Sequence, residues 1–225
     1  HLFKLSIEIA KRQNLLLQMG YMFRNHDGFK KIASIVFNGE IGRIFQIRAN
    51  MSTNLTPEAE QPISRHTGGI LYDLAGHMID QIVYLLGRPN TTKSFLRQDI
   101  SQQKQFSDNT LCVLEFEHAI ATVDINSRTI NHIKSRRFEV YGDKGSLILE
   151  PFEPAEYLRM SFKSSDKYLG INEEYPYKLI PLKDKPRYVE NFESFIKTIK
   201  GEQKSDRTLE HELLVQETLL RVVGG

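Results

Sequence analysis

The chain has 225 residues, and 40% of them are hydrophobic, which is enough to bury a sizeable core in one large domain or two small ones. Its 30 basic and 28 acidic residues are well interspersed and leave a net charge of +2, so the composition gives no reason to expect nucleic acid or an acidic membrane as a partner. The single cysteine, Cys112, cannot form an intrachain disulfide, and no apolar stretch has the roughly 18 residues of a membrane helix, so we expect a cytoplasmic protein.

The first part of the chain predicts a helix over residues 2–13, followed by an apolar run of strand length over residues 15–23. A second helical period stops at Asn38-Gly39, and alternating residues over 44–51 are typical of a half-buried strand. Residues 52–67 are polar and contain two prolines, so we expect a loop that delivers Arg65 and His66 to the start of the next element. Both are candidates for binding a polar substrate, although loop cations are also commonly just solvated.

The stretch over residues 67–87 predicts an amphipathic helix with marked ends, because Gly68 and Gly69 precede the helix and Gly87 closes it. At about 100° per residue, Asp73, His77, Asp80 and Tyr84 fall on one face, and apolar residues cover the other. The sequence therefore predicts a helix with a buried back and a polar front.

The polar front of this helix suits proton transfer. His77 is a candidate general base, because a carboxylate one turn earlier, that of Asp73, can bond one ring nitrogen and raise the basicity of the other. Gly76 lies at the edge of this stripe, where an interior glycine indicates the close approach of another group. Two alternatives stay open: an ordinary solvated helix face, and a metal site formed by Asp73, His77 and Asp80, which no second His or Cys cluster accompanies.

After Pro89 the pattern changes to strands and then returns to helices. We expect strands over residues 93–99, 110–117, 119–126, 137–141 and 146–150, with the last two joined by a hairpin turn at residues 142–145. Residues 151–185 contain four prolines and show no clear period, whereas residues 187–200 and 209–224 predict two amphipathic helices. This order implies an α+β fold: an open, mostly antiparallel mixed sheet with helices packed on one face.

Five motifs occur in order along the chain: Gly20-Tyr21-Met22-Phe23-Arg24, Gly39-Glu40-Ile41-Gly42, the stretch from Gly68-Gly69 through Asp73 and His77 to Asp80, Asp108-Asn109, and Gly142-Asp143-Lys144-Gly145-Ser146-Leu147. Together they resemble the part of the Gfo/Idh/MocA oxidoreductases, such as glucose-fructose oxidoreductase and inositol dehydrogenase, that follows the nucleotide-binding domain. The resemblance implies a C-terminal domain like that of dihydrodipicolinate reductase. It makes residues 1–23 a remnant helix and strand of the nucleotide-binding domain and residues 24–225 a substrate-binding and oligomerisation domain.

In that family a carbinol of a sugar, cyclitol or related polyol is oxidised, or its ketone is reduced, by hydride exchange with NAD or NADP. The resemblance implies that His77 takes the hydroxyl proton, that Asp73 orients and polarises the catalytic group, and that Asp80 bonds a substrate hydroxyl. It also places Arg24 near the cleft. The family's open sheet face often packs against another subunit, which implies a homodimer or tetramer.

The departures from the family pattern concern the cofactor. The chain has no G-x-G-x-x-G followed by a helix, and the family's Glu-Lys-Pro motif, expected shortly before His1, does not occur in it. NAD or NADP would then be bound mainly by an N-terminal domain that this chain lacks, and we expect the chain alone to be inactive. Two other functions remain as alternatives: a non-catalytic ligand-binding or dimerisation module, and a metal-dependent hydrolase.

Overall fold

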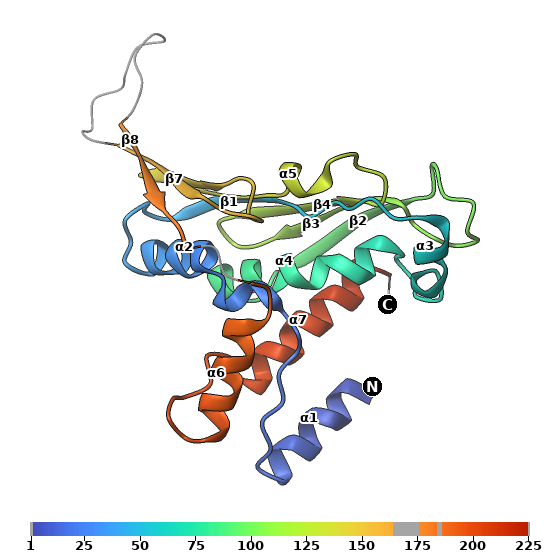
Figure 1. The fold of residues 1–225 in the computed structure, drawn as a ribbon, viewed down its shortest axis with the longest axis horizontal. Helices are drawn as coiled ribbons and strands as arrows, with labels where there is room; N and C mark the ends of the chain where they lie inside the picture. The colour runs from blue at the N-terminus through green and yellow to red at the C-terminus, as the bar shows by residue number, and fades with distance from the viewer. Residues whose placement is uncertain (1, 164–175, 184–185, 225) are drawn as a thin grey trace.

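The computed structural model of the protein describes residues 2–163, 176–183 and 186–224. One open sheet has the strand order β2-β3-β4-β1-β5-β6-β7-β8 (Figure 1). The strands are β1 (Ile44–Asn50), β2 (Thr91–Arg97), β3 (Asn109–Glu115), β4 (Ile120–Asn126), β5 (Arg137–Gly142), β6 (Gly145–Leu149), β7 (Tyr157–Phe162) and β8 (Tyr177–Pro181). Neighbouring strands are antiparallel except β1 and β4, which are parallel. The predicted mixed, mostly antiparallel sheet is confirmed.

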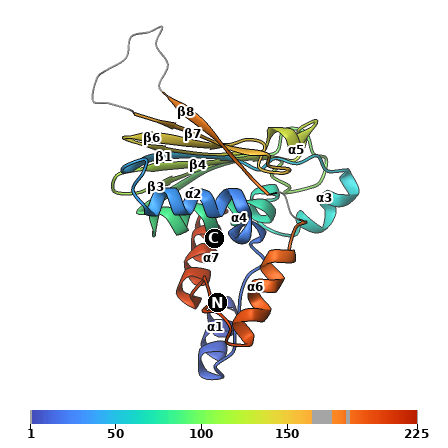
Figure 2. The same cartoon turned by 60° about the vertical axis from the view of Figure 1, so that its left-hand side comes forward.

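The helices are α1 (Leu2–Arg12), the 3₁₀ helix η1 (Met22–Asn25), α2 (Asp27–Phe37), α3 (Pro57–Ile63), α4 (Ile70–Leu86), α5 (His132–Ser135), α6 (Val189–Ile199) and α7 (Leu209–Val222). Two of them, α2 and α4, lie along one face of the sheet, and α7 packs against the outer side of α4 (Figures 1 and 2). From there α1 and α6 project away from the sheet (Figure 2). Among the described residues, no helix combines the length and apolarity that a membrane span requires.

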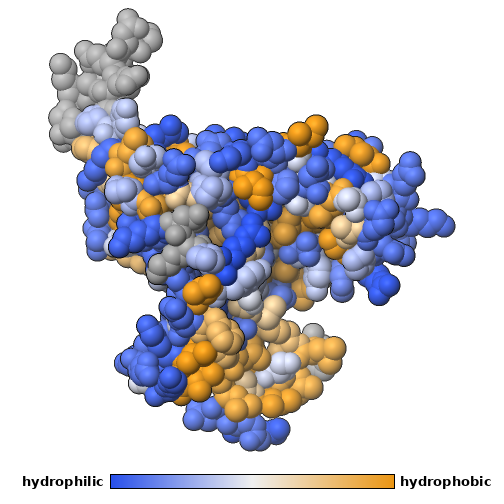
Figure 3. Space-filling view, viewed as in Figure 1, coloured by the Kyte–Doolittle hydropathy of each residue, from blue (hydrophilic) through white to orange (hydrophobic). Residues whose placement is uncertain are grey.

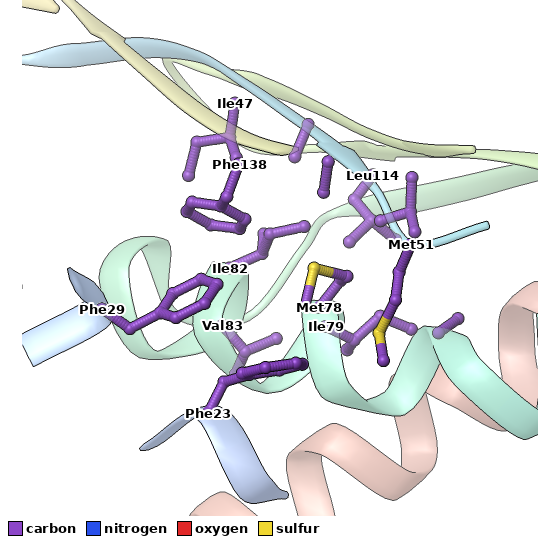
Figure 4. Close-up of a cluster of buried hydrophobic side chains, with 14 of the residues drawn as sticks. Phe23, Phe29, Ile47, Met51, Met78, Ile79, Ile82, Val83, Leu114 and Phe138 are labelled. Atoms are coloured by element: carbon purple, nitrogen blue, oxygen red, sulfur yellow. The ribbon is translucent and has the colours of Figure 1, made fainter. Parts of the chain in front are cut away.

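The main core lies between the sheet and α4. Met78 and Ile82 of α4 are fully buried beside Ile47, Leu114 and Phe138 of the sheet (Figure 4). Each such side chain contributes roughly 1.5–3 kcal/mol of burial free energy. The predicted apolar back of the helix is thereby confirmed, and α4 is fixed firmly enough to hold side chains on its other face in place.

The predicted strand over residues 15–23 is wrong. Residues 15–21 have no regular structure, and η1 follows them. A strand needs a neighbouring strand to bond its backbone groups, and no described residue offers one here. Side chains bond this segment instead: Arg207 Nη1 donates to the Met19 carbonyl oxygen at 3.1 Å, and Asn191 Nδ2 donates to that of Tyr21 at 3.2 Å.

Three further elements lie where no regular structure was expected. Helix α3 interrupts the predicted loop over residues 52–67, because Pro57 occupies its first position and Thr56 Oγ1 accepts a capping bond from the Ala59 amide at 3.4 Å. A proline suits the first position because its missing N–H would have no partner there, and the second proline, Pro62, lies in the last turn of the same short helix. Strands β7 and β8 lie within residues 151–185, of which part falls outside the described residues.

Candidate active site on helix α4

The start of α4 depends on the two glycines that precede it. Gly68 and Gly69 have φ angles of +92° and +51°, in the region that side chains with a Cβ rarely adopt. A Cβ on Gly69 would lie 2.5 Å from the backbone nitrogen and oxygen of Ser107. The double glycine therefore lets the chain turn tightly against its neighbour and fixes the point at which α4 begins.

A cleft of about 240 Å³ opens between α4, α7 and the segment that leads into η1. Helix α4 contributes Tyr72, Asp73, Gly76 and His77 to its lining. The remaining lining residues are Met19, Gly20 and Tyr21 of the entering segment and Gln216 and Leu219 of α7. Two of the predicted site residues, Asp73 and His77, are thus brought together at one cleft.

His77 is half-buried between two aromatic rings, with ring centroids 6.2 Å away for Tyr21 and 5.8 Å away for Phe23, both edge-on. Burial lowers the pKa of its imidazole to about 4, although the charge of Asp80 raises it. Within the described part of the chain, its buried Nδ1 has no hydrogen-bond partner. The predicted bond from Asp73 to this ring is therefore absent at Nδ1, and His77 is neutral near physiological pH.

Asp73 is exposed at the mouth of the cleft. Loss of hydration raises the pKa of its carboxyl above the usual value, and the nearby His66 opposes this shift. The His66 ring stacks on Tyr72 with centroids 4.6 Å apart, so this loop histidine does lie beside the cleft. Arg65 is exposed on the same turn and is not among the cleft-lining residues.

Asp80 and Arg24 do not reach the cleft. Asp80 is 0% exposed, and its Oδ1 lies 2.5 Å from Arg24 Nη2 and 2.8 Å from His211 Nε2. Burial raises the pKa of Asp80, but the His211 hydrogen bond and the Arg24 charge outweigh it and hold that pKa below its usual value. Asp80 was expected to bond a substrate hydroxyl and Arg24 to lie near the cleft; instead the two form a buried ion pair that ties η1, α4 and α7 together, and neither lines this cleft.

The group that approaches α4 closely at Gly76 is the ring of Tyr21, which lies over it. A Cβ at position 76 would come within 3.2 Å of Tyr21 Cε1 and 3.6 Å of Leu219 Cδ2. The glycine therefore leaves room for an aromatic side chain that forms one wall of the cleft. In the sequence, the only sign of this contact is a glycine inside a helical pattern.

Sequence reasoning missed the residues that α7 brings to this region. His211 bonds Asp80, and Glu212 lies fully buried close to Tyr21. Neither position stands out locally, because α7 follows α4 by more than a hundred residues and only folding brings them together. No group of three or more His, Cys, Asp or Glu side chains that could hold a metal ion occurs among the described residues.

Comparison with known proteins identifies the family of this chain. The family model described as GFO/IDH/MocA C-terminal domain matches residues 29–148, more than half of the chain. The chain belongs to the GFO/IDH/MocA family. The chain is similar to myo-inositol 2-dehydrogenase of Thermotoga maritima, with 25% identity over 200 residues, or 87% of this chain and 57% of that protein. The scyllo-inositol 2-dehydrogenase (NAD(+)) of Bacillus subtilis is 28% identical over 166 residues, or 72% of this chain and 48% of that protein.

This GFO/IDH/MocA chain spans about half the length of the relatives that it matches. Among solved structures, levoglucosan dehydrogenase in complex with NADH and levoglucosan superposes with a TM-score of 0.79 at 17% identity. That match covers 98% of this chain and 66% of levoglucosan dehydrogenase. The likeness shows that the two share a fold.

Proposed function

We propose that this chain is the substrate-binding part of an NAD(P)-dependent oxidoreductase that interconverts a carbinol and its ketone in a sugar, cyclitol or related polyol. The observation that carries the proposal is the cleft in which neutral His77 lies one helical turn from Asp73. Relatives named as inositol dehydrogenases and a structural neighbour that binds levoglucosan support the substrate class.

The proposed chemistry assigns proton handling to His77. Its imidazole is uncharged at neutral pH and can accept the proton of a carbinol hydroxyl as that carbon is oxidised. Asp73, at the mouth of the same cleft, can accept a hydrogen bond from a neighbouring substrate hydroxyl and stabilise the imidazolium that forms. We assign no substrate contact to Asp80 or Arg24, because both are buried in their own ion pair.

The described residues do not provide a dinucleotide site. The sequence holds no G-x-G-x-x-G, and the single parallel strand pair, β1 with β4, is not joined by a βαβ unit. We therefore propose that a nucleotide-binding domain outside this chain holds the nicotinamide cofactor, which supplies the hydride chemistry when bound. The choice between NAD and NADP belongs to that domain.

We further propose that residues 1–23 belong to that domain, as the resemblance implies, and that the rest of the domain packs against α1 and α6. Large apolar side chains are exposed on α1 and α6, among them Leu2 at 78% and Phe192 at 66%, and Figure 3 shows the resulting apolar surface away from the sheet. Exposed surfaces of this kind mark places where another protein domain packs.

The sheet's outer face combines exposed Phe45 and Ile120 with charged residues such as Arg48. Pairing of two copies of the chain through this face remains a prediction.

The proposed function is tested by assaying the intact protein for reduction of NAD⁺ and NADP⁺ with a panel of inositols, hexoses and anhydrosugars. Turnover of at least one of these compounds is expected. If no polyol is oxidised and no matching ketone is reduced, whereas a sugar still binds, the chain is a ligand-binding module instead. Turnover that requires added metal and no nicotinamide would favour the hydrolase alternative.

A further inference from the structure

Arg207 holds the segment that leads to the cleft. It lies in the turn before α7 and is 6% exposed. Its Nη1 donates to the Met19 carbonyl oxygen at 3.1 Å, and its Nη2 donates to Gln18 Oε1 at 3.3 Å. Ser205 in the same turn accepts a bond from Gln18 Nε2 at 2.9 Å. The entering segment has no strand partner among the described residues, so these bonds, together with that from Asn191 Nδ2 to the Tyr21 carbonyl oxygen, hold it in place.

Glu212 is the carboxylate that faces this arginine. It is 0% exposed, and its Oε1 lies 3.3 Å from Arg207 Nε. Its carboxylate also faces the backbone N–H of Met19 in the entering segment, which favours the charged form and so lowers its pKa, against the larger effect of burial. Burying such a group costs several kcal/mol unless an opposite charge compensates it. Its role is therefore best explained by Arg207, whose guanidinium it fixes in orientation.

The segment held by Arg207 ends at an aromatic ring that touches His77. Tyr21 follows Met19 by two residues and is 5% exposed. Its ring stands at 88° to the imidazole of His77, and the backbone of Gly76 lies beneath it. A shift of the segment would move this ring away and admit water to the imidazole.

We propose that Arg207, oriented by Glu212, is a positioning residue for His77, because it holds the entering segment so that Tyr21 shields the imidazole. The consequence for catalysis rests on the proposed function, whereas the coupling between Arg207 and His77 does not. The other charged groups that act on His77 are Asp80, Arg136, Glu153 and Arg187, and all of them lie outside the entering segment and α7. Substitution of Arg207 leaves these groups unchanged.

The test is the pKa of His77, measured by NMR in the full chain with isotope-labelled histidine, whose resonance is identified by its loss in His77→Gln. The double variant Arg207→Met/Glu212→Gln removes both charges together, so no unpaired buried charge remains. Its His77 pKa is expected to rise toward the ordinary value by about one unit or more, a tenfold change in proton affinity. Arg207→Lys keeps the charge but loses the planar fork, so a smaller shift in the same direction is expected.

Glu210→Gln is the matched control, because Glu210 lies in the same first turn of α7 but is exposed and paired with Lys11. It is expected to leave the His77 pKa unchanged. Folding of each variant is checked by circular dichroism. If the folded variants show the same His77 pKa as the unaltered chain, the proposal is overturned; if the double variant does not fold, the His77 pKa of Arg207→Lys decides alone. No substrate or cofactor is involved, so this failure would leave the proposed function standing, and absence of turnover would leave the coupling intact.

Discussion

The depressed pKa of His77 makes a prediction about stability in acid. The folded chain holds this imidazole at a pKa of about 4, whereas an unfolded histidine titrates near 6.5. As pH falls through 6.5 the unfolded state takes up a proton that the folded state refuses, so stability is lost between pH 6.5 and 4. The linkage relation puts this loss at about 2 kcal/mol between about pH 7.5 and about pH 5.

Replacing His77 with glutamine should remove this loss. We expect urea unfolding near the two pH values to show that the unaltered chain loses about 2 kcal/mol more than His77→Gln does. His118→Gln is the control, since His118 is exposed at the turn between β3 and β4 and should behave like the unaltered chain. The titrating groups other than His77 and His118 are common to the three proteins, and their contributions cancel. Equal losses in the unaltered chain and His77→Gln would refute the burial of a neutral imidazole.

Three further substitutions test the framework around the site by denaturant unfolding. Asp80→Ala should cost about 3–5 kcal/mol because it leaves the buried guanidinium of Arg24 unpaired, whereas removal of the surface ion-pair residue Asp99 should cost far less; similar costs would contradict the buried role. Between about pH 5 and about pH 8 the unaltered chain should lose about 2–3 kcal/mol more stability than Glu212→Gln does, because burial raises the Glu212 pKa to about 7 and stability falls as pH rises from 4.5 through 7; equal losses would contradict this. Gly39→Ala should lower the free energy of unfolding by roughly 1–2 kcal/mol, because the position has a positive φ, and Gly69→Ala should lower it clearly more, because a Cβ there would also meet neighbouring backbone. Equal costs would show that backbone strain at positive φ is the whole effect.

Helix α4 could be predicted from the sequence because its signals are local. Its apolar positions recur at helical spacing, its glycines mark both ends, and the structure confirms its extent within two residues. The β5–β6 hairpin was predictable for the same reason, since the turn residues lie between two alternating runs. Two of the predicted site residues, Asp73 and His77, lie together in the cleft.

The division of the polar stripe could not be predicted. Asp73 and Asp80 occupy the same face of an ideal helix, but α7 covers only the second of them and supplies His211 as its partner. A helical projection contains no information about which part of a face another element will cover. Likewise, the apolar composition of residues 15–23 satisfied the pattern of a strand without revealing whether any partner strand lies beside it.

The measurement that tests the account most directly is steady-state turnover of the intact protein with a polyol substrate and its nicotinamide cofactor, compared between His77→Ala and His118→Ala. If His77 handles the proton, its substitution should lower kcat by about a hundredfold or more, and the exposed His118 should be dispensable. If His77→Ala retains near-normal kcat, His77 is an ordinary half-buried residue, and the cleft on α4 is not the catalytic site.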